Sequence, residues 1–284
     1  MRTLNFDSNK PLLYLVATPI GNLQEVSPRT IEVLSGVDLI ACEDTRVTGK
    51  LLSLLGIKKT LISLREHNEV SVSHDLIEQI KKGLKVAYVS DAGYPCISDP
   101  GSKLVKVCLE NDINVSTVSG SNAALNALVA SGLCGDHFYF HGFLNAKESV
   151  KLEELRELST KKETLIFYEA PHRIKKTLEA LYEIFGDRKA CLARELTKKH
   201  EEFIRCGLKT MSELDESTLK GELVIIVEGS SGEEKPIISN TDIVNMVKSM
   251  VDSGMSTKDA IKKVSEMTKI NKNIIYKAYH LNWY

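Results

Sequence analysis

The chain has 284 residues, of which 43% are hydrophobic and 26% charged, and its formal net charge is -1. This composition is typical of a globular protein and argues against a disordered chain. No run approaches the roughly 20 apolar residues of a membrane helix, and the first residues lack a secretory signal pattern, so we expect a cytoplasmic protein. Because the six cysteines form no C-x-x-C pair, we expect neither a zinc site nor a disulfide framework.

The N-terminal part alternates short apolar runs with helical patterns. Strands are predicted at residues 12–17, 37–42, 60–64, 84–90 and 113–119, and helices near 28–35, 46–55, 70–82 and 102–111. Regular alternation of strand and helix implies crossover connections and a mainly parallel sheet. We therefore expect an N-terminal α/β domain over residues 1–119.

The next part has a different order of elements. Helical patterns at 147–160 and 172–185 are followed by the strand-like runs KACLARE, EEFIRCG and GELVIIVEG, with no helix between them. Strands that follow one another directly favour a mixed sheet, so we expect a second α/β domain over residues 120–230.

The last part reads as a linker followed by helices. Residues 231–240 combine Ser, Gly, Pro and charge, a composition typical of linkers. Beyond them, Thr241 and Ser256 are expected N-caps within a three-helix module over residues 241–284. This module holds seven lysines and four acidic residues, so it is the basic part of the chain, and its lysines are expected to attract nucleic acid phosphates.

Each predicted strand of the first domain ends in a polar turn. These turns are TPIGN, CEDTR, REHNE, SDAGYPCISDPG and SGSN. One such segment alone needs no more than turn formation to explain it, but five together predict a cleft, because ligands bind outside the carboxyl ends of strands in open α/β sheets. No G-x-G, P-loop, H-E-x-x-H or G-x-S-x-G motif occurs, which favours a metal-free group transfer.

Four segments match a known family: LVATPIGNLQEVSPRTIEVLSGVDLIACEDTRVTGKLL, SDAGYPCISDPG, TLIFYEAPHR and ARELTKKHEE. They resemble the ribosomal RNA small-subunit methyltransferase I family, which belongs with the tetrapyrrole methylases, in order over residues 12 to about 228. The resemblance implies two α/β domains with S-adenosylmethionine in the cleft between them, usually in a homodimer. It also implies 2′-O-methylation of a cytidine in the decoding region of 16S rRNA, with the 30S subunit as the expected setting.

The resemblance also assigns cofactor-binding positions. Asp91, Ala92 and Gly93 match the main cofactor loop beside the methionine part of the molecule. The remaining assigned positions are Pro19, Ile97, Asp99, Ser119, Ser121, Asn122, Phe167, Tyr168, Leu192, Ala193 and Glu222. Tyr94 and Ser121 depart from the residues that many relatives carry, which puts side-chain roles at these two positions in doubt.

Four residues at loop ends are candidates for the reacting site: Glu43, Arg46, His67 and Lys198. A positioned base that takes the proton of the ribose hydroxyl accelerates such a transfer by ~10²–10⁴-fold. For His67 an ordinary exposed histidine is an equal alternative. Arg46 and Lys198 can also form structural ion pairs, although their place beside the expected cleft favours contact with RNA.

Two other functions remain open. The first is a precorrin or uroporphyrinogen-type tetrapyrrole methylase, whose expected G-x-G-P-G opening is replaced here by TPIGN. The second is an effector-sensing regulator that binds DNA through residues 241–284, a module that contains no arginine for reading guanine.

Overall fold

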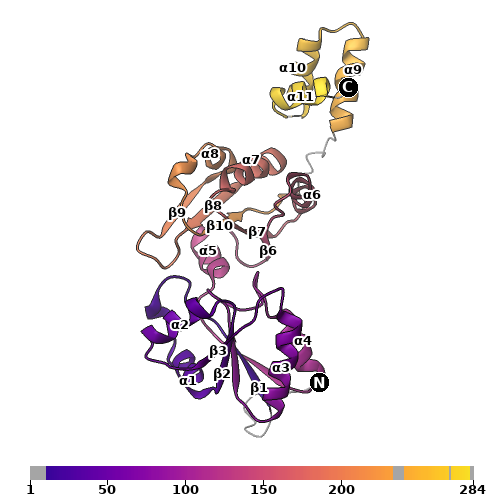
Figure 1. Ribbon diagram of the computed structural model, residues 1–284. Helices are drawn as coiled ribbons and strands as arrows, with labels where there is room; N and C mark the ends of the chain where they lie inside the picture. Colours follow the sequence, from indigo (N-terminus) through magenta and orange to yellow (C-terminus); the bar gives the residue numbers. More distant parts are fainter. Residues whose placement is uncertain (1–10, 233–239, 269, 282–284) are drawn as a thin grey trace. The chain divides into compact units, whose positions relative to one another are not determined.

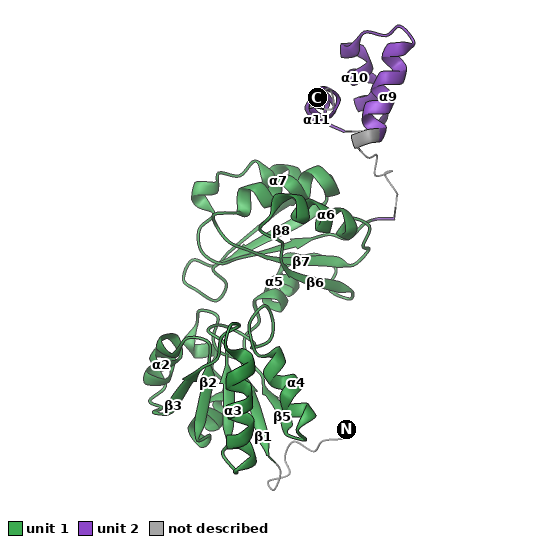
Figure 2. Ribbon diagram, turned by 45° about the vertical axis from the view of Figure 1, so that its right-hand side comes forward, with its two compact units in different colours: residues 1–230 green, residues 231–284 purple. Residues whose placement is uncertain are grey.

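The computed structural model describes residues 11–232, 240–268 and 270–281. The chain divides into two compact units, residues 1–230 and 231–284 (Figure 2). Most of the predicted linker, at residues 233–239, lies outside the described residues. Each unit has its own hydrophobic core, and the first unit contains two separate sheets.

The first sheet is parallel throughout, as the alternation of strands and helices predicts. Its strand order is β3-β2-β4-β1-β5. The strands are β1 (Leu12–Val16), β2 (Leu39–Cys42), β3 (Thr60–Ser63), β4 (Val86–Val89) and β5 (Asn114–Val118). All five predicted strands of this region are confirmed.

Helices cover both faces of the first sheet. Figure 1 shows α1 and α2 on one side of it and α3 and α4 on the other. In β4, Tyr88 packs in the core with α3 and α4, whereas Ala87 and Val89 pack in the core with α1 and α2. Burial on both faces explains why the central strands β2 and β4 read as unbroken apolar runs. The helices are α1 (Pro28–Gly36), α2 (Thr45–Leu54), α3 (Glu69–Lys81) and α4 (Ser102–Glu110).

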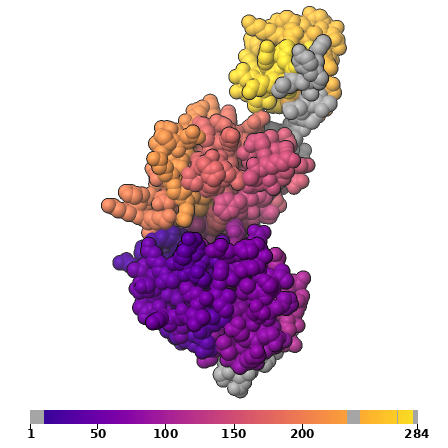
Figure 3. Space-filling model, in the orientation of Figure 1, coloured from indigo at the N-terminus to yellow at the C-terminus, as the bar shows by residue number. Residues whose placement is uncertain are grey.

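The second sheet is mixed, as the sequence also predicts. Its order is β6-β7-β10-β8-β9, in which β6 and β7 are parallel and the other pairs antiparallel. The strands are β6 (Phe138–Phe143), β7 (Thr164–Glu169), β8 (Lys189–Arg194), β9 (Glu202–Gly207) and β10 (Leu223–Val227). We call the part from β1 to β5 the first lobe and the part from α5 to β10 the second lobe; both are visible in Figure 3, indigo to purple and pink to orange.

Helices also cover both faces of the second sheet. α5 (Ala123–Ser131) packs on one face, and α6 (Glu148–Leu158), α7 (Ile174–Phe185) and α8 (Leu208–Ser212) pack on the other. The sequence did not predict α5, because its residues are small or apolar around the whole helix and give no amphipathic period. The prediction of no helix between β9 and β10 was also wrong, because the five residues of α8 lie there, too few to show a helical period.

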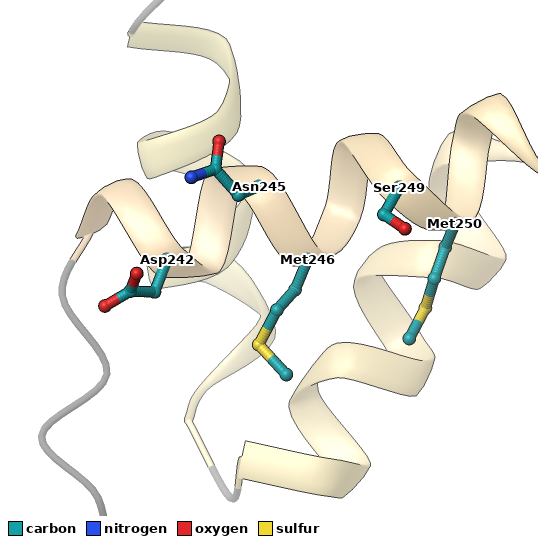
Figure 4. A pocket seen from close by; sticks show the side chains of 5 residues that line it. All are labelled: Asp242, Asn245, Met246, Ser249 and Met250. Atoms are coloured by element: carbon teal, nitrogen blue, oxygen red, sulfur yellow. The ribbon is translucent and has the colours of Figure 1, made fainter.

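The second unit consists of α9 (Asn240–Asp252), α10 (Thr257–Thr268) and α11 (Lys272–Leu281) around one core. Ser256 caps α10 as predicted, since its Oγ accepts the N–H of Asp259 at 3.1 Å. Thr241 is not an N-cap, because α9 already begins at Asn240. A groove of about 360 Å³ runs along one face of α9, past Asp242, Asn245, Met246, Ser249 and Met250 (Figure 4).

Candidate functional site

The loops that follow the strands of the first sheet are joined to one another at its carboxyl edge. Thr18 and Gly93 exchange two backbone hydrogen bonds of 2.9 and 3.0 Å, which join the loops after β1 and β4. The Thr18 hydroxyl donates to the carbonyl of Ser90 at 3.1 Å, and the Ala17 N–H donates to the carbonyl of Val118 at 3.2 Å. These bonds hold three of the five predicted turns in one place.

The loop between β4 and α4 has an unusual backbone. Cys96 and Ser98 have φ angles of 69° and 59°, in the left-handed region that residues other than glycine adopt uncommonly. Gly101 has φ of 121°, and a Cβ there would collide with the ring of Tyr88 and lie 2.8 Å from Cys96 Sγ. Strain of this kind persists only where the surroundings enforce it, and it concentrates at functional sites.

A buried carboxylate from α3 holds the end of this loop. Glu69 Oε1 accepts the backbone N–H groups of Gly101, Lys103 and Leu104 at 3.0, 2.8 and 3.3 Å. A carboxylate at a helix N-terminus satisfies free N–H groups and interacts well with the helix dipole. Glu69 therefore caps α4 in place of Gly101, which has no side chain to do so.

A cavity of about 390 Å³ lies between the two lobes, a volume within the range of small-molecule sites. The loops at the carboxyl edge of the first sheet form one wall, and the ends of β7 and β10 with the loops beside them form the other. It is lined by Ile20, Ala92, Gly93, Tyr94, Ile97, Ser98, Asp99, Asn122, Ala123, Phe143, Tyr168, Glu169, Ala170, Pro171, Gly221, Glu222, Leu223 and Val224.

Aromatic side chains and a helix N-terminus shape the second-lobe side of this cavity. The ring of Tyr168 packs edge-on against Phe140 and Phe143, with centroid distances of 5.0 and 5.6 Å. Asn122 caps α5, since its Oδ1 accepts the N–H of Leu125 at 2.9 Å. The cavity therefore combines flat apolar surfaces with the positive end of a helix.

Three carboxyl groups gather at the first-lobe side. The pKa of Asp99 is raised to about 6, mainly by burial and also by the nearby charges of Glu43 and Asp91, while a hydrogen bond with Ser90 works in the opposite direction. Burial and the charge of Asp91 also raise the pKa of Glu43. Three acidic groups so close together create a negative potential that suits a positively charged ligand.

Glu169 lines the cavity but is fully engaged by its own lobe. Its Oε1 accepts the Ala170 N–H at 2.8 Å and pairs with Arg173 Nε at 3.2 Å, and its Oε2 accepts the Thr177 hydroxyl at 2.6 Å. Glu169 therefore fixes the turn after β7 that forms part of the cavity wall.

Lys198 is held by two carboxylates of its own lobe. Its Nζ lies 3.0 Å from Glu195 Oε1 and 3.1 Å from Glu222 Oε2. Burial works against its charged form, but the hydrogen bonds to these two carboxylates raise the pKa of Lys198 above its usual value. A Cβ on Gly21 would lie 2.5 Å from Lys198 Cγ, so a side chain there would displace the side chain of Lys198.

The other candidates for the reacting site lie around this region. Arg46 is 85% exposed and its NH2 group pairs with Asp44 Oδ2 at 2.5 Å. His67 is exposed in the turn after β3, where Asn68 Oδ1 accepts the N–H of Arg65 at 2.7 Å. Glu43 directly follows β2 and is half-buried. Among the four, none lines the cavity, although Lys198 pairs with Glu222, which does.

The structure brings together half of the expected cofactor-binding positions. The cavity lining includes Ala92, Gly93, Ile97, Asp99, Asn122, Tyr168 and Glu222, and it does not include Pro19, Asp91, Ser119, Ser121, Phe167, Leu192 and Ala193.

Strand alternation explains two of the absences. Phe167 and Leu192 point their side chains into the core beneath α6 and α7, whereas Tyr168 faces the core that contains α5. Only the backbone of Phe167 and Leu192 can face a ligand. The sequence shows the alternation, but it does not show which face of the second sheet carries the cavity.

The sequence did not indicate several of the residues that line the cavity. Ile20 and Ala123 are small or apolar, so they carry no chemical signal of their own. Phe143 is the last residue of β6, and Ala170 and Pro171 directly follow β7, so the available signal was their position at the end of a strand.

The family model described as "Tetrapyrrole (Corrin/Porphyrin) Methylases" matches residues 12–212, which include both sheets except for β10. The chain belongs to the tetrapyrrole methylase family.

Curated relatives of this tetrapyrrole methylase match almost its whole length. A protein of Bacillus subtilis (strain 168) named ribosomal RNA small subunit methyltransferase I is 44% identical over 98% of this chain and 97% of its own. Proteins of the same name from Synechocystis and Haemophilus influenzae are 42% and 43% identical, each over 93% of this chain and over 96% and 95% of their own.

Solved structures of tetrapyrrole methylases share the fold. Uroporphyrin-III-C-methyltransferase from Thermus thermophilus gives a TM-score of 0.56 at 19% identity and covers 77% of this chain and 94% of its own. A cobalt precorrin-4 methyltransferase gives 0.59 at 14% identity, over 78% of this chain and 96% of its own. At these identities the likeness establishes the fold alone.

As a tetrapyrrole methylase, the chain is a methyltransferase that uses S-adenosylmethionine as methyl donor. Within the described ranges, His, Cys, Asp and Glu side chains form no group of three or more that could hold a metal ion. Among the helices that the structure describes, none has the length and apolar character needed to cross a membrane.

Proposed function

We propose that this methyltransferase transfers a methyl group from S-adenosylmethionine to the ribose 2′-hydroxyl of a cytidine in the decoding region of 16S rRNA. The observation that carries the proposal is the 44% identity, over nearly the whole of both chains, with a ribosomal RNA small subunit methyltransferase I. The tetrapyrrole-biosynthesis enzymes that share the fold are 14–19% identical and support no substrate assignment.

The cavity residues suit S-adenosylmethionine. Gly93 has a φ of 76° and exposes its backbone to the cavity. A Cβ at this position would lie 3.4 Å from Ile20 Cγ2. We assign the methionine part to Ala92, Gly93 and Asp99, because a carboxylate complements the ammonium and sulfonium charges. The adenine fits the apolar surface of Leu223 and Val224 beside Tyr168.

When bound, S-adenosylmethionine supplies an electrophilic methyl group on a positively charged sulfur. The protein's contribution is to align the ribose oxygen with that group and to exclude water, and alignment alone lowers the barrier of such a displacement substantially. We assign removal of the hydroxyl proton to Glu43 in preference to His67. Glu43 stands among the carboxyl groups beside the cavity and has a raised pKa, which suits a base, whereas His67 is exposed in a neighbouring turn.

Basic residues around the cavity are proposed to hold the RNA. Arg46 presents its guanidinium largely to solvent while Asp44 orients it. Glu195 and Glu222 hold Lys198, whose side chain also lies close to Gly21 of the first lobe, so we assign it the positioning of the β8–β9 loop against that lobe. This division makes Arg46 the candidate for phosphate contact.

We further propose a homodimer that acts in the cytoplasm on the assembled 30S subunit. Several large side chains of α5 and of β6, which is an edge strand, are exposed, among them Leu125, Val129, Phe138 and Phe143. Exposed apolar patches and open strand edges are typical of interaction surfaces. Sedimentation analysis of the purified protein tests the dimer.

Incubation with labelled S-adenosylmethionine and either 30S subunits or bare 16S rRNA tests the function. The proposal expects label in rRNA, located on a ribose so that the adjacent phosphodiester resists alkaline hydrolysis. Label on a base, or no label with either substrate while the protein binds S-adenosylmethionine, overturns it. Transfer to subunits but not to bare rRNA places the reaction on the assembled particle.

A further inference from the structure

One face of α11 is exposed and has an unusual composition. Its exposed residues are Lys272, Asn273, Tyr276, Lys277 and His280, which recur at the spacing of one helix face. The opposite face carries Ile275, Ala278 and Tyr279, which are buried in the core shared with α9 and α10. The core therefore fixes the orientation of α11 and leaves its basic, aromatic face to solvent.

Tyr276 is the large exposed aromatic residue of this face. The residue is 56% exposed, and its ring packs on His280 with a centroid distance of 4.3 Å and an interplanar angle of 48°. His280 in turn packs against the buried ring of Tyr279 at 5.4 Å and 86°. His280 thus connects Tyr276 to the core, so the exposed ring is supported in a defined position.

The charged residues of α11 itself carry no negative charge. Lys272 and Lys277 belong to the same helix, which contains no acidic residue. On α10, three lysines (Lys258, Lys262 and Lys263) and two acidic residues (Asp259 and Glu266) are exposed, so lysines are in excess there too. Aromatic side chains among lysines are the combination with which proteins hold single-stranded nucleic acid, since the rings stack on bases while the lysines neutralise phosphates.

We propose that Tyr276, supported by His280, is a stacking platform for an unpaired RNA base, with Lys272 and Lys277 on the flanking phosphates. The proposal rests on RNA being the substrate, and it adds to that function a preference for single-stranded over double-stranded RNA. Phosphate attraction gives the lysines a role but leaves the exposed ring without one. In a duplex the base faces are already stacked, so the ring has no partner there.

The test compares full-length Tyr276→Ala and Tyr276→Phe with the parent protein on three labelled probes. The first probe is a single strand of oligoadenylate of about 12 nucleotides, a length within the site size of proteins that bind single strands. The second is the same strand with abasic central positions, and the third is an RNA duplex of equal length. Fluorescence anisotropy gives the dissociation constants, and thermal melting verifies folding.

For the intact strand, we expect Tyr276→Ala to weaken binding by about 5- to 100-fold, the range of a lost base–aromatic stack. Tyr276→Phe should bind like the parent, because the ring remains. Neither variant should change affinity for the abasic strand or the duplex. Lys277→Gln is the matched control: it should weaken binding to all three probes and reduce the salt dependence, which Tyr276→Ala should leave unchanged.

Two outcomes overturn the platform. One is parental affinity of Tyr276→Ala for the intact strand. The other is an equal loss on the intact and abasic strands, which assigns Tyr276 to folding or to a protein contact. Both outcomes are independent of methyl transfer. If the parent protein methylates rRNA and Tyr276→Ala binds every probe normally, only the platform is refuted. If the parent protein transfers no methyl group, only the proposed function is refuted.

Discussion

Asp91 Oδ1 accepts the backbone N–H of Asp44 at 3.1 Å, which ties the loop after β4 to the loop after β2. These strands are neighbours in the first sheet, so the bond crosses directly between adjacent turns. Asp91 also adds its charge to that of Glu43 and Asp99 beside the cavity. It therefore contributes both to the position of the loops and to the negative potential that we propose favours the cofactor.

Asp91→Asn separates these two contributions. The amide keeps an oxygen that can accept the Asp44 N–H, while the negative charge disappears. We expect a nearly unchanged melting temperature and binding of S-adenosylmethionine weaker by about tenfold, on the scale of a lost charge-assisted interaction. Isothermal titration calorimetry measures the affinity.

Asp91→Ala is the control, because it removes the hydrogen bond as well as the charge. It should lower the melting temperature in addition to the affinity. If Asp91→Asn binds S-adenosylmethionine as tightly as the parent, Asp91 serves the loop connection alone.

Asp99 predicts a pH dependence of stability. Its pKa is raised to about 6 in the folded protein, so the folded state favours the protonated form. Ionising Asp99 therefore costs stability as the pH rises from about 4, the unfolded value, to about 6. Asp99→Asn removes this cost. At pH 7.5, the free energy of unfolding of the ligand-free variant should exceed that of the parent by about 1–3 kcal/mol.

Melting curves between pH 4 and 8 measure the difference. The two proteins should melt alike near pH 4, and the gap should open up to about pH 6 and then stay constant. The same variant should bind S-adenosylmethionine more weakly, because it lacks the proposed partner of the ligand's positive charge. A gap that is already complete at pH 4 points to a packing effect of the amide.

The sequence predicted the first sheet well because the central strands β2 and β4 of that sheet are buried on both faces. Its strands are short apolar runs that end in polar turns, and both signals are local. α5 was missed because Ala124, Ala127 and Leu128 bury one side while the exposed side includes Val129, so hydrophobicity does not alternate around the helix.

The site was only partly predictable, for a related reason. The turns after the first-sheet strands indicated one wall of the cavity, and Ala92, Gly93 and Asp99 do line it. The opposite wall depends on which face of the second sheet meets the first lobe, a long-range relationship that leaves no local pattern. The cap of α4 by Glu69, which is 32 residues before Gly101, is likewise set by the fold.

Gly101 predicts a severe effect of one added methyl group. Gly101→Ala would place Cβ against the Tyr88 ring and Cys96 Sγ, and alanine disfavours φ of 121°. We expect a loss of about 2–4 kcal/mol in the free energy of unfolding, as for combined overpacking and backbone strain. Urea denaturation measures it.

Gly83→Ala is the matched control. Gly83 also has a positive φ, 96°, but a Cβ added there would have no atom within 4 Å. It should lose only about 1 kcal/mol, from the backbone alone. Equal losses at the two positions would show that the contacts with Tyr88 and Cys96 relax freely and that the loop tolerates a side chain.

The lysines of α10 predict a salt-dependent affinity for RNA. Lys258, Lys262 and Lys263 are exposed, and each phosphate that a lysine neutralises releases about 0.7 counterion from a single strand. A triple substitution to glutamine should therefore weaken RNA binding at low salt and reduce the slope of log affinity against log salt by about 2. Binding of S-adenosylmethionine should stay the same, because the core of this unit is separate from both lobes.

Anisotropy titrations from about 50 to 200 mM salt give the slope. An unchanged slope would mean that these lysines do not contact phosphates and that the basic surface of the module serves another purpose, such as contact with a second protein.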